Sequence, residues 1–404
     1  MTLEYRNPSA EEGIVPALST TVRAFGGEIR PYEREHLPKL MPPDRIHCAY
    51  ERGQPVGTAA AYPFEMTIPG GQAPLGGVTW VGVIPSHRRR GVMAELMRRQ
   101  LTDLREREEP LAALWASEPA IYGRFGYGIA APVLELRAET AGFRFRGDPA
   151  PVGRVRLVER EEARTRFVEL YEHIRPLRAA MLTRNDDAWD VWRLADEEFM
   201  RDGFGPKFYA LYEHDGAAEA YATYRVKGHW DDDGIPRGEV RVIEALATTP
   251  DASRELWRFL FGIDLTARVQ SFPFDPASPL FLSVVDARRL RLALSDGLWL
   301  RLVDVERALA ARSYAADDEL VVEVADDVCD WNAGRFRVGT TVGRTRDAAD
   351  LRLDVGDLAS AYLGAFNFER LAAAQRVDEL TDGARARATA LFRTDLPPFC
   401  PEIF

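Results

Sequence analysis

Along the first 153 residues, apolar and polar positions alternate in short runs and then follow a helical period. The runs typical of strands are residues 46–50, 56–62 and 77–84. Between 92 and 104, apolar Val92, Leu96 and Leu101 recur on one face of a helix, and charged residues occupy the other. Strands alternating with a helix predict an α/β domain. Gly and Pro residues over 143–153 predict a linker that ends this domain.

The next block, residues 154–298, repeats the same order of elements. Its strand-like runs are 209–213, 218–226 and 240–247, and its helical pattern is 254–263. The polar turn Asp231–Gly234 separates the last two strands. Three strands followed by a helix, twice in one chain, suggest that this block is a diverged duplicate of the first.

A third block runs from 299 to 404 and ends in a stiff apolar tail. Its predicted strands are 300–304, 319–324, 335–338, 339–343 and 351–353, and its predicted helices are 305–311, 355–363 and 368–377. The last residues, Pro397–Phe404, include three prolines and several apolar side chains. Proline restricts the backbone, and an unanchored terminus usually frays. We therefore expect this tail to be docked against the protein.

The charge balance narrows the classes of partner. The chain has 404 residues, and 63 Asp and Glu outweigh 52 Lys and Arg to give a formal net charge of −11. That balance argues against a nucleic-acid-binding surface. It suits cationic substrates, because an acidic surface attracts amines. The sequence lacks the patterns of a signal peptide and of a membrane span, so we expect a cytoplasmic protein with no nucleic-acid or membrane partner.

The cysteines do not form a ligand pattern. Cys48, Cys329 and Cys400 lie far apart in the sequence, so we expect neither a zinc site nor a disulfide framework. A sparse, odd number of cysteines suits a reducing compartment.

Residues 78–93 combine an apolar strand, a basic turn and the start of an amphipathic helix. Backbone N–H groups at a helix N-terminus are unpaired and lie beside the positive end of the helix dipole. Gly91 allows the backbone to approach a phosphate closely, and Arg88, Arg89 and Arg90 add positive charge. The pattern favours a diphosphate-bearing cofactor over a merely solvated helix start. The glycine-rich motifs of dinucleotide and P-loop sites do not occur in this stretch.

Two motifs resemble those of known acetyltransferases. The order Arg88-x-x-Gly91 after the strand resembles the acetyl-CoA loop of the GNAT superfamily of N-acetyltransferases, although Met93 stands where that loop usually ends in Gly or Ala. The string Tyr122-Gly-Arg-Phe-Gly-Tyr127-Gly, together with His-Arg-Arg-Arg-Gly, resembles the Eis (enhanced intracellular survival) family. That resemblance covers the whole chain.

The resemblance implies an α/β (α+β) fold of three domains. Residues 1–153 would form an acetyl-CoA-binding acetyltransferase domain, and 154–298 a degenerate acetyltransferase-like domain. Residues 299–404 would form a domain similar to sterol carrier proteins, which supplies the C-terminal carboxylate. The resemblance also implies a homo-hexamer and acceptors such as aminoglycosides or lysine side chains. In the second block Asp251 stands at the equivalent of the basic turn and would repel a pyrophosphate, so we expect no second cofactor site.

Roles for individual residues follow from the same resemblance. Acetyl-CoA is the implied co-substrate, and no metal takes part. The backbones of Val81 and Val83 would meet the pantetheine arm and the acetyl carbonyl, and Ser117 would lie beside the cofactor. The residues implied to hold the pyrophosphate are Arg88, Arg89, Gly91 and Val92. Tyr122 is the implied general acid, and the free α-carboxylate of Phe404 is the implied general base.

Proton-transfer energetics bear on these roles. A tyrosine of pKa about 10 protonates a thiolate of pKa about 8.5 at a cost of about 2 kcal/mol, so Tyr122 is a feasible acid. An α-carboxylate of pKa about 3.5 faces a gap of roughly 9 kcal/mol to a lysine-like ammonium of pKa about 10.4. Burial, an acidic amine or a water relay would narrow that gap. Polycationic acceptors are therefore favoured, because neighbouring charges lower the pKa of each amine.

Each assignment has an ordinary structural alternative. Tyr122 also fits a core position, Ser117 the end of a strand, and Trp80 and Trp115 either the acceptor pocket or the core. The acidic residues considered for binding the amine are Glu28, Glu118 and Glu402. Turn or core structure is favoured for His87 and Tyr127. Two other functions remain open: a lipid- or sterol-binding protein that uses the third block, and a catalytically silent acyl-CoA-binding scaffold.

Overall fold

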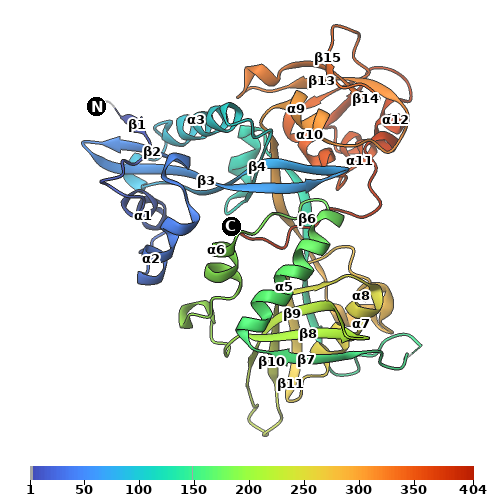
Figure 1. The fold of residues 1–404 in the computed structure, drawn as a ribbon. Helices are drawn as coiled ribbons and strands as arrows, with labels where there is room; N and C mark the ends of the chain where they lie inside the picture. The colour runs from blue at the N-terminus through green and yellow to red at the C-terminus, as the bar shows by residue number, and fades with distance from the viewer. Residues whose placement is uncertain (1–2, 148) are drawn as a thin grey trace.

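The first half of a large sheet comes from the N-terminal part of the chain. The computed structural model describes residues 3–147 and 149–404. The strands of this half are β1 (Glu4–Arg6), β2 (Ile46–Glu51), β3 (Gln54–Ile68), β4 (Gly71–Val83) and β5 (Leu111–Trp115). Its helices are α1 (Val15–Ala24), α2 (Pro31–Leu40), α3 (Val92–Glu106) and α4 (Pro119–Tyr122), with short turns η1 (Pro43–Arg45), η2 (Pro85–His87) and η3 (Gly123–Phe125). Strands β1 to β4 are antiparallel neighbours, and β5 runs parallel to β4. Figure 1 shows α3 above these strands and α1 and α2 below them.

The second half repeats this arrangement, as the sequence pattern predicts. Its strands are β7 (Arg154–Val158), β8 (Phe208–His214), β9 (Ala217–Lys227), β10 (Gly238–Ala247) and β11 (Thr266–Phe274). Its helices and turns are α5 (Arg160–Ile174), η4 (Arg175–Leu177), α6 (Asp186–Ala188), η5 (Trp189–Arg193), η6 (Glu198–Met200), α7 (Pro250–Phe261), α8 (Leu280–Ser283) and η7 (Ala287–Leu290). Strands β7 to β10 are antiparallel and β11 is parallel to β10. The described part of the predicted linker 143–153 contains no helix or ladder strand, and residue 148 lies outside the described residues.

Two long strands join the halves into one sheet. Strand β12 (Ala293–Leu302) pairs with β5, β6 (Gly128–Glu139) pairs with β11, and β12 and β6 pair with each other. The order is β1-β2-β3-β4-β5-β12-β6-β11-β10-β9-β8-β7. The boundary predicted between residues 298 and 299 therefore falls inside a strand, and the predicted strand 300–304 is the end of β12 rather than the first strand of the third domain. Leu298, Leu300 and Leu302 of β12 are fully buried, which fixes it in the centre.

The third domain has its own sheet. Its strands are β13 (Glu319–Ala325), β14 (Gly334–Gly339), β15 (Gly343–Arg344), β16 (Leu351–Asp354) and β17 (Val377–Glu379), in the order β15-β14-β13-β16-β17. Its helices are α9 (Val305–Ala311), α10 (Val355–Tyr362), α11 (Phe368–Ala373) and α12 (Ala384–Leu391), with the turn η8 (Asp330–Asn332). The helix predicted over 368–377 ends at Ala373, because Gln375 takes a left-handed backbone conformation (φ 60°) that ends the helix before β17.

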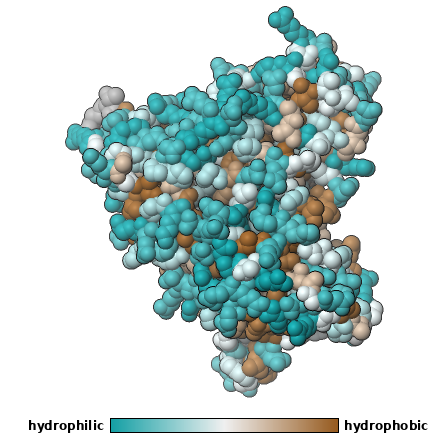
Figure 2. Space-filling model, viewed as in Figure 1, coloured by the Kyte–Doolittle hydropathy of each residue, from teal (hydrophilic) through white to brown (hydrophobic). Residues whose placement is uncertain are grey.

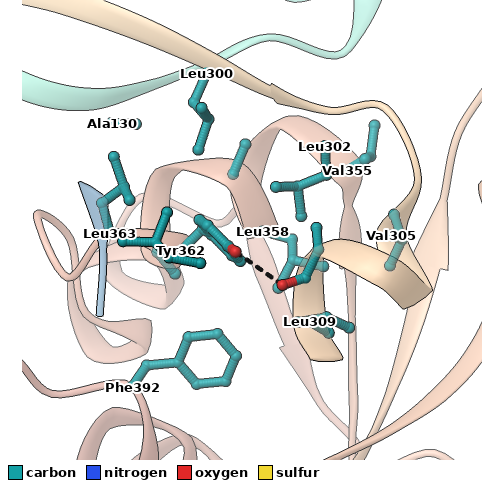
Figure 3. Packing of buried hydrophobic residues seen from close by; sticks show 14 of the residues in the cluster. Ala130, Leu300, Leu302, Val305, Leu309, Val355, Leu358, Tyr362, Leu363 and Phe392 are labelled. Atoms are coloured by element: carbon teal, nitrogen blue, oxygen red, sulfur yellow. Dashed lines mark hydrogen bonds between the residues drawn. The ribbon is translucent and has the colours of Figure 1, made fainter. Parts of the chain in front are cut away.

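The interior of the third domain is filled by its own side chains. Figure 3 shows Leu358, Tyr362 and Phe392 packed with Leu300 and Leu302 of β12. The Tyr362 hydroxyl donates a hydrogen bond to a backbone carbonyl of α9 at 2.7 Å. Among the described residues, the five leading pockets draw on this domain only through its C-terminal tail. The packed interior disfavours the lipid-binding alternative.

Among residues 3–147 and 149–404, none of the helices has the length and apolar character needed to cross a membrane. In the same residues, His, Cys, Asp and Glu side chains form no group of three that would hold a metal ion.

Candidate active site

A wedge opens between β4 and β5. The two strands pair only from Leu75 to Gly77 and then diverge. A pocket of about 510 Å³ lies in the wedge. Its lining includes all eight residues expected at the cofactor and the general acid, namely Val81, Val83, Arg88, Arg89, Gly91, Val92, Ser117 and Tyr122. The fold thus brings together residues that lie up to 41 positions apart in the sequence (81 to 122).

A β-bulge in β4 forms one wall of this pocket. Trp80 and Val81 together oppose the single residue Ala59 of β3, and Trp80 has a left-handed backbone (φ 52°). The Trp80 carbonyl accepts hydrogen bonds from the hydroxyls of Thr21, at 2.8 Å, and Thr58, at 2.9 Å. These bonds hold a conformation that is strained for a residue with a side chain. Because a bulge leaves backbone groups out of the ladder, the Val81 backbone is available to a ligand.

The first turn of α3 forms an anion site at the other wall. Its N-cap is Gly91 in a left-handed conformation (φ 78°), and no side chain caps the free N–H groups. Arg88 is occupied, because its guanidinium donates to the carbonyls of Ala24 at 2.9 Å and Val83 at 3.3 Å. The exposed Arg89 guanidinium has no hydrogen bond or ion pair within the described residues. Arg89 is therefore the arginine that is free to meet a phosphate.

The remaining basic residues of this turn are paired with an acidic side chain. His87 and Arg90 both pair with Glu51 of β2, at 3.2 Å and 3.3 Å. The pKa of Glu51 is lowered, chiefly by the hydrogen bond with His87. This pairing agrees with the interpretation of His87 as part of the turn.

Tyr122 lies on the opposite wall, in the short helix α4. It is 6% exposed, and burial raises the pKa of its hydroxyl, with a smaller contribution from the nearby charge of Glu118. The Tyr122 hydroxyl makes no hydrogen bond to the described residues, and its ring packs edge to face on Tyr127 at 6.0 Å between centroids. A protonated, unpartnered phenol at a pocket wall can donate its proton to a ligand. Tyr127, whose hydroxyl is buried and which is not among the lining residues of the cofactor pocket, supports the ring of Tyr122.

The glycines of the Tyr122–Gly128 motif let the third domain pack directly behind this acid. A Cβ at Gly126 would lie 2.8 Å from the Val355 side chain of α10, and one at Gly128 would lie 1.8 Å from the Gly356 carbonyl of the same helix. Gly126 also has a left-handed backbone (φ 75°). The motif therefore encodes the contact that positions Tyr122.

The C-terminal tail leaves the third domain and ends at the centre of the molecule (Figure 1). The Phe399 N–H donates to the Ala179 carbonyl at 2.9 Å, and the Pro397 carbonyl accepts from Arg178 at 2.7 Å. The Pro401 carbonyl accepts from Arg193 at 3.0 Å. These contacts confirm the expectation that the tail is docked.

Glu402, which the sequence makes a candidate for binding the amine, anchors the end of the tail and lines a pocket beside Phe404. Its carboxylate is 5% exposed and accepts hydrogen bonds from Arg184, Arg193 and, at 3.3 Å, the hydroxyl of Tyr171. Arg184 also pairs with the buried Glu244 of β10. Burial alone would raise the pKa of Glu244, but the charges of Arg184 and Arg193 hold it at about 2. A carboxylate held in this way is not free to take an ammonium.

Phe404 lies beside β4 on the other side of the bulge. Its ring packs edge to face on Phe64 at 5.2 Å between centroids and approaches Gly77 so closely that a Cβ there would lie 3.2 Å away. A second pocket, of about 390 Å³, is lined by Phe404 and by Trp80. The next residue along the strand, Val81, lines the first pocket, so the two pockets have neighbouring residues of the same bulge in their walls.

Two predicted acceptor residues lie elsewhere. Glu28 is exposed in the segment between α1 and α2 and lines neither pocket, and Trp115 packs its ring against Phe272 at 6.0 Å. Glu118 lines the cofactor pocket instead of the acceptor pocket. Sequence reasoning missed the acceptor-pocket residues Tyr62, Trp192 and Phe272. No local motif marks them, because they come from three segments that only the fold brings together.

A second wedge, between β10 and β11, is lined partly by the tail. Its pocket, of about 330 Å³, includes Leu396, Phe399 and Pro401. Here Thr249 caps the first turn of α7 through Ala252 N–H at 3.1 Å, and an aspartate follows it in that turn. The helix N-terminus is thus capped and acidic, in contrast to α3. The wedge in the second half of the sheet therefore contacts the C-terminal tail.

Comparisons with known families match all three domains. The family model described as an acetyltransferase (GNAT) domain matches residues 4–130, and a second acetyltransferase (GNAT) domain model matches residues 180–302. A sterol carrier protein domain model matches residues 305–401. The predicted fold class is therefore confirmed.

Relatives share this organisation along nearly their whole length. An uncharacterized N-acetyltransferase of Streptomyces avermitilis is 42% identical over 395 residues, covering 95% of this chain and 96% of its own. The N-acetyltransferase Eis of Mycobacterium tuberculosis is 37% identical over 361 residues, covering 85% of this chain and 84% of its own. The crystal structure of Eis1 from Mycobacterium abscessus superposes with a TM-score of 0.85 at 32% identity, with full coverage of both chains. The chain belongs to the Eis family of GNAT N-acetyltransferases.

Proposed function

We propose that this N-acetyltransferase moves the acetyl group directly from acetyl-CoA to a primary amine, with Tyr122 as the general acid and the Phe404 carboxylate as the general base. One observation carries the proposal: the bulge of β4 lines both pockets, with Val81 in the pocket of Tyr122 and Trp80 in the pocket of Phe404. The uncapped turn of α3 and the free Arg89 suit the pyrophosphate of acetyl-CoA. The bulge at Val81, which interrupts the β3–β4 ladder, suits its pantetheine arm and acetyl carbonyl.

The proposed reaction needs two proton transfers, and Tyr122 and the Phe404 carboxylate supply both. The amine nitrogen attacks the thioester carbonyl, a C–N bond forms and the C–S bond breaks. The Phe404 carboxylate takes a proton from the amine, directly or through water, and Tyr122 gives its proton to the departing thiolate. A backbone N–H of the Val81–Val83 segment stabilises the oxyanion.

The cysteines do not suit a covalent acetyl-enzyme. Cys48, Cys329 and Cys400 are all buried. Burial raises the thiol pKa of Cys48 and of Cys400 to about 12. Because the thiolate is the nucleophile, these residues favour direct transfer.

Amine-dependent release of thiol from acetyl-CoA tests the proposed function. The acceptors to compare are primary amines that include aminoglycosides and lysine peptides, with a sample lacking amine as the blank. Release that rises with the amine and yields one acetylamine per thiol is expected. Acetyl-CoA binding without release for any amine would contradict the proposal and favour the silent scaffold. The implied hexamer stays a prediction, which the sedimentation of the purified chain tests.

Arg89→Ala is expected to raise the dissociation constant of acetyl-CoA by about 10- to 100-fold, the loss typical of one charge-assisted contact. The matched control is Arg90→Ala, because Arg90 is already paired with Glu51. Titration calorimetry with acetyl-CoA measures both. Equal affinities of Arg89→Ala and the wild type would remove the pyrophosphate assignment.

Glu402→Gln is expected to lower kcat by about 100-fold while the affinity for acetyl-CoA stays unchanged, because a small shift of the tail displaces the base. Losing one of two carboxylates around two buried arginines also lowers the free energy of unfolding, by roughly 3 kcal/mol. Steady-state kinetics at 20 °C and denaturant unfolding measure the two effects. Glu106→Gln, at the exposed end of α3, is the control. A normal kcat in Glu402→Gln would show that the anchor does not position the base.

A further inference from the structure

The pocket beside Phe404 has walls of aromatic rings. The rings come from Tyr62, Trp80, Trp192, Phe272 and Phe404, and aliphatic side chains fill much of the rest of the lining. A smaller pocket of about 180 Å³ shares the walls Tyr62 and Trp192 and reaches Phe64 on one side and the polar residues Thr183, Arg184 and Asn185 on the other. Figure 2 shows hydrophobic side chains along the waist between the upper and lower lobes, while much of the surrounding surface is hydrophilic.

Contacts between these rings leave few polar atoms for a ligand. Tyr62 packs edge to face on Trp192 at 5.0 Å between centroids. The indole N–H of Trp80 already donates to the Tyr62 hydroxyl at 3.2 Å. Burial raises the pKa of that hydroxyl to about 12, so it stays neutral. The rings therefore offer mainly faces and edges to a ligand, and the polar side chains of the lining are Thr79 and the charged residues Arg193 and Glu402.

The charges at this pocket almost cancel. Arg193 and Glu402, the charged side chains among its described lining residues, pair with each other. Behind them, Arg184 and Glu244 form a second buried pair. The terminal carboxylate of Phe404 is left as the one uncompensated charge of the lining. An acceptor with four or five ammonium groups would have to desolvate most of them without a partner, which is costly.

We infer that the preferred acceptor is a monoamine whose single amino group is carried on a flat apolar body, of the arylalkylamine type. This inference rests on the proposed function and narrows its acceptor class away from polycations. The ring of such an amine packs on Trp192 and Tyr62. Its nitrogen meets the Phe404 carboxylate, and neighbouring ring faces also attract the ammonium form before it loses its proton. The net charge of −11 attracts any cationic acceptor to the protein. The aromatic walls of the pocket then discriminate between acceptors by the apolar part of the amine.

Specificity constants for four amines test the inference. The probes are 2-phenylethylamine, ethylamine, spermine and tobramycin, each measured by thiol release from acetyl-CoA. We expect 2-phenylethylamine to exceed ethylamine, spermine and tobramycin by at least about 100-fold in kcat/KM, as differential burial of a ring allows. Spermine or tobramycin as the best acceptor would overturn the inference and leave the proposed function intact. No turnover of any of the four, with acetyl-CoA bound, would remove both.

A variant of the aromatic wall separates packing from chemistry. Trp192→Ala is expected to lower the ratio of kcat/KM for 2-phenylethylamine to that for ethylamine by about 10-fold, because only the larger amine reaches that wall. Unchanged acetyl-CoA affinity shows that the variant is folded. The control is Trp230→Ala, a tryptophan that is 57% exposed and lines none of these pockets. An unchanged ratio in Trp192→Ala would overturn the placement of the ring.

Discussion

Tyr122→Phe is expected to lower kcat by about 100- to 1,000-fold and to leave the affinity for acetyl-CoA within about twofold, since a positioned general acid contributes on this scale. The substitution removes one oxygen and keeps the ring that packs on Tyr127. Tyr122 lines the cofactor pocket, and its hydroxyl makes no hydrogen bond to any described residue. Binding of acetyl-CoA depends on the α3 turn and is therefore spared.

The matched control for this substitution is Tyr127→Phe. The Tyr127 hydroxyl is buried without a hydrogen-bond partner among the described residues, and Tyr127 is not among the lining residues of the cofactor pocket, so removal of the hydroxyl is expected to leave kcat unchanged. Equal losses in Tyr122→Phe and Tyr127→Phe would assign both tyrosines to packing. Full activity of Tyr122→Phe would contradict the acid assignment.

The pH profile of the wild type follows from the same residue. Activity rises with pH as more of the acceptor amine becomes neutral. Burial raises the pKa of Tyr122 above its ordinary value, so the phenol keeps its proton until the pH exceeds about 10. No fall in kcat/KM is therefore expected between pH 7 and about 10. A descending limb centred near pH 8 or 9 would mean that another group is the acid.

Extending the chain by one glycine after Phe404 is expected to lower kcat by at least about 100-fold. One residue moves the carboxylate by about 3.5 Å, which exceeds the tolerance of a reacting pair. The anchor at Glu402 and the packing of the Phe404 ring on Phe64 would hold the rest of the tail in place. The acceptor pocket loses its one uncompensated charge at the reacting position.

Two further changes at the C-terminus separate the role of the carboxylate from that of the Phe404 ring. Phe404→Leu keeps the terminal carboxylate and changes only the ring, so a loss of less than about 10-fold is expected. Converting the terminal carboxylate of the full chain to an amide removes the charge without adding length, and should lower kcat as much as the extension does. An extended or amidated chain with normal kcat would show that the base lies elsewhere.

The cofactor half of the site could be read from the sequence because its signals are local. The amphipathic period from Val92 predicts α3, and Gly91 and Arg89 precede it directly. The order of strands and helix repeats in the second half, so the duplication was also visible. These patterns depend on neighbouring residues, and neighbours in sequence determine helix starts and turns.

The acceptor half could not be read in this way. Tyr62, Trp192 and Phe272 come from three separate segments and meet only because β12 and β6 join the two halves of the sheet. The role of Glu402 depends on Arg184 and Arg193, which lie about 210–220 positions earlier and carry no motif. An ion pair between such distant positions leaves no periodic signal, so sequence reasoning assigned Glu402 to the substrate.

The most direct test of transfer between two pockets lined by the same bulge is a grid of initial rates for thiol release by the full chain, with acetyl-CoA and the amine varied together. If both substrates must be bound at once on either side of the β4 bulge, the double-reciprocal lines intersect. Parallel lines would indicate an acetyl-enzyme intermediate, and they would contradict direct transfer from acetyl-CoA to an amine held beside Phe404.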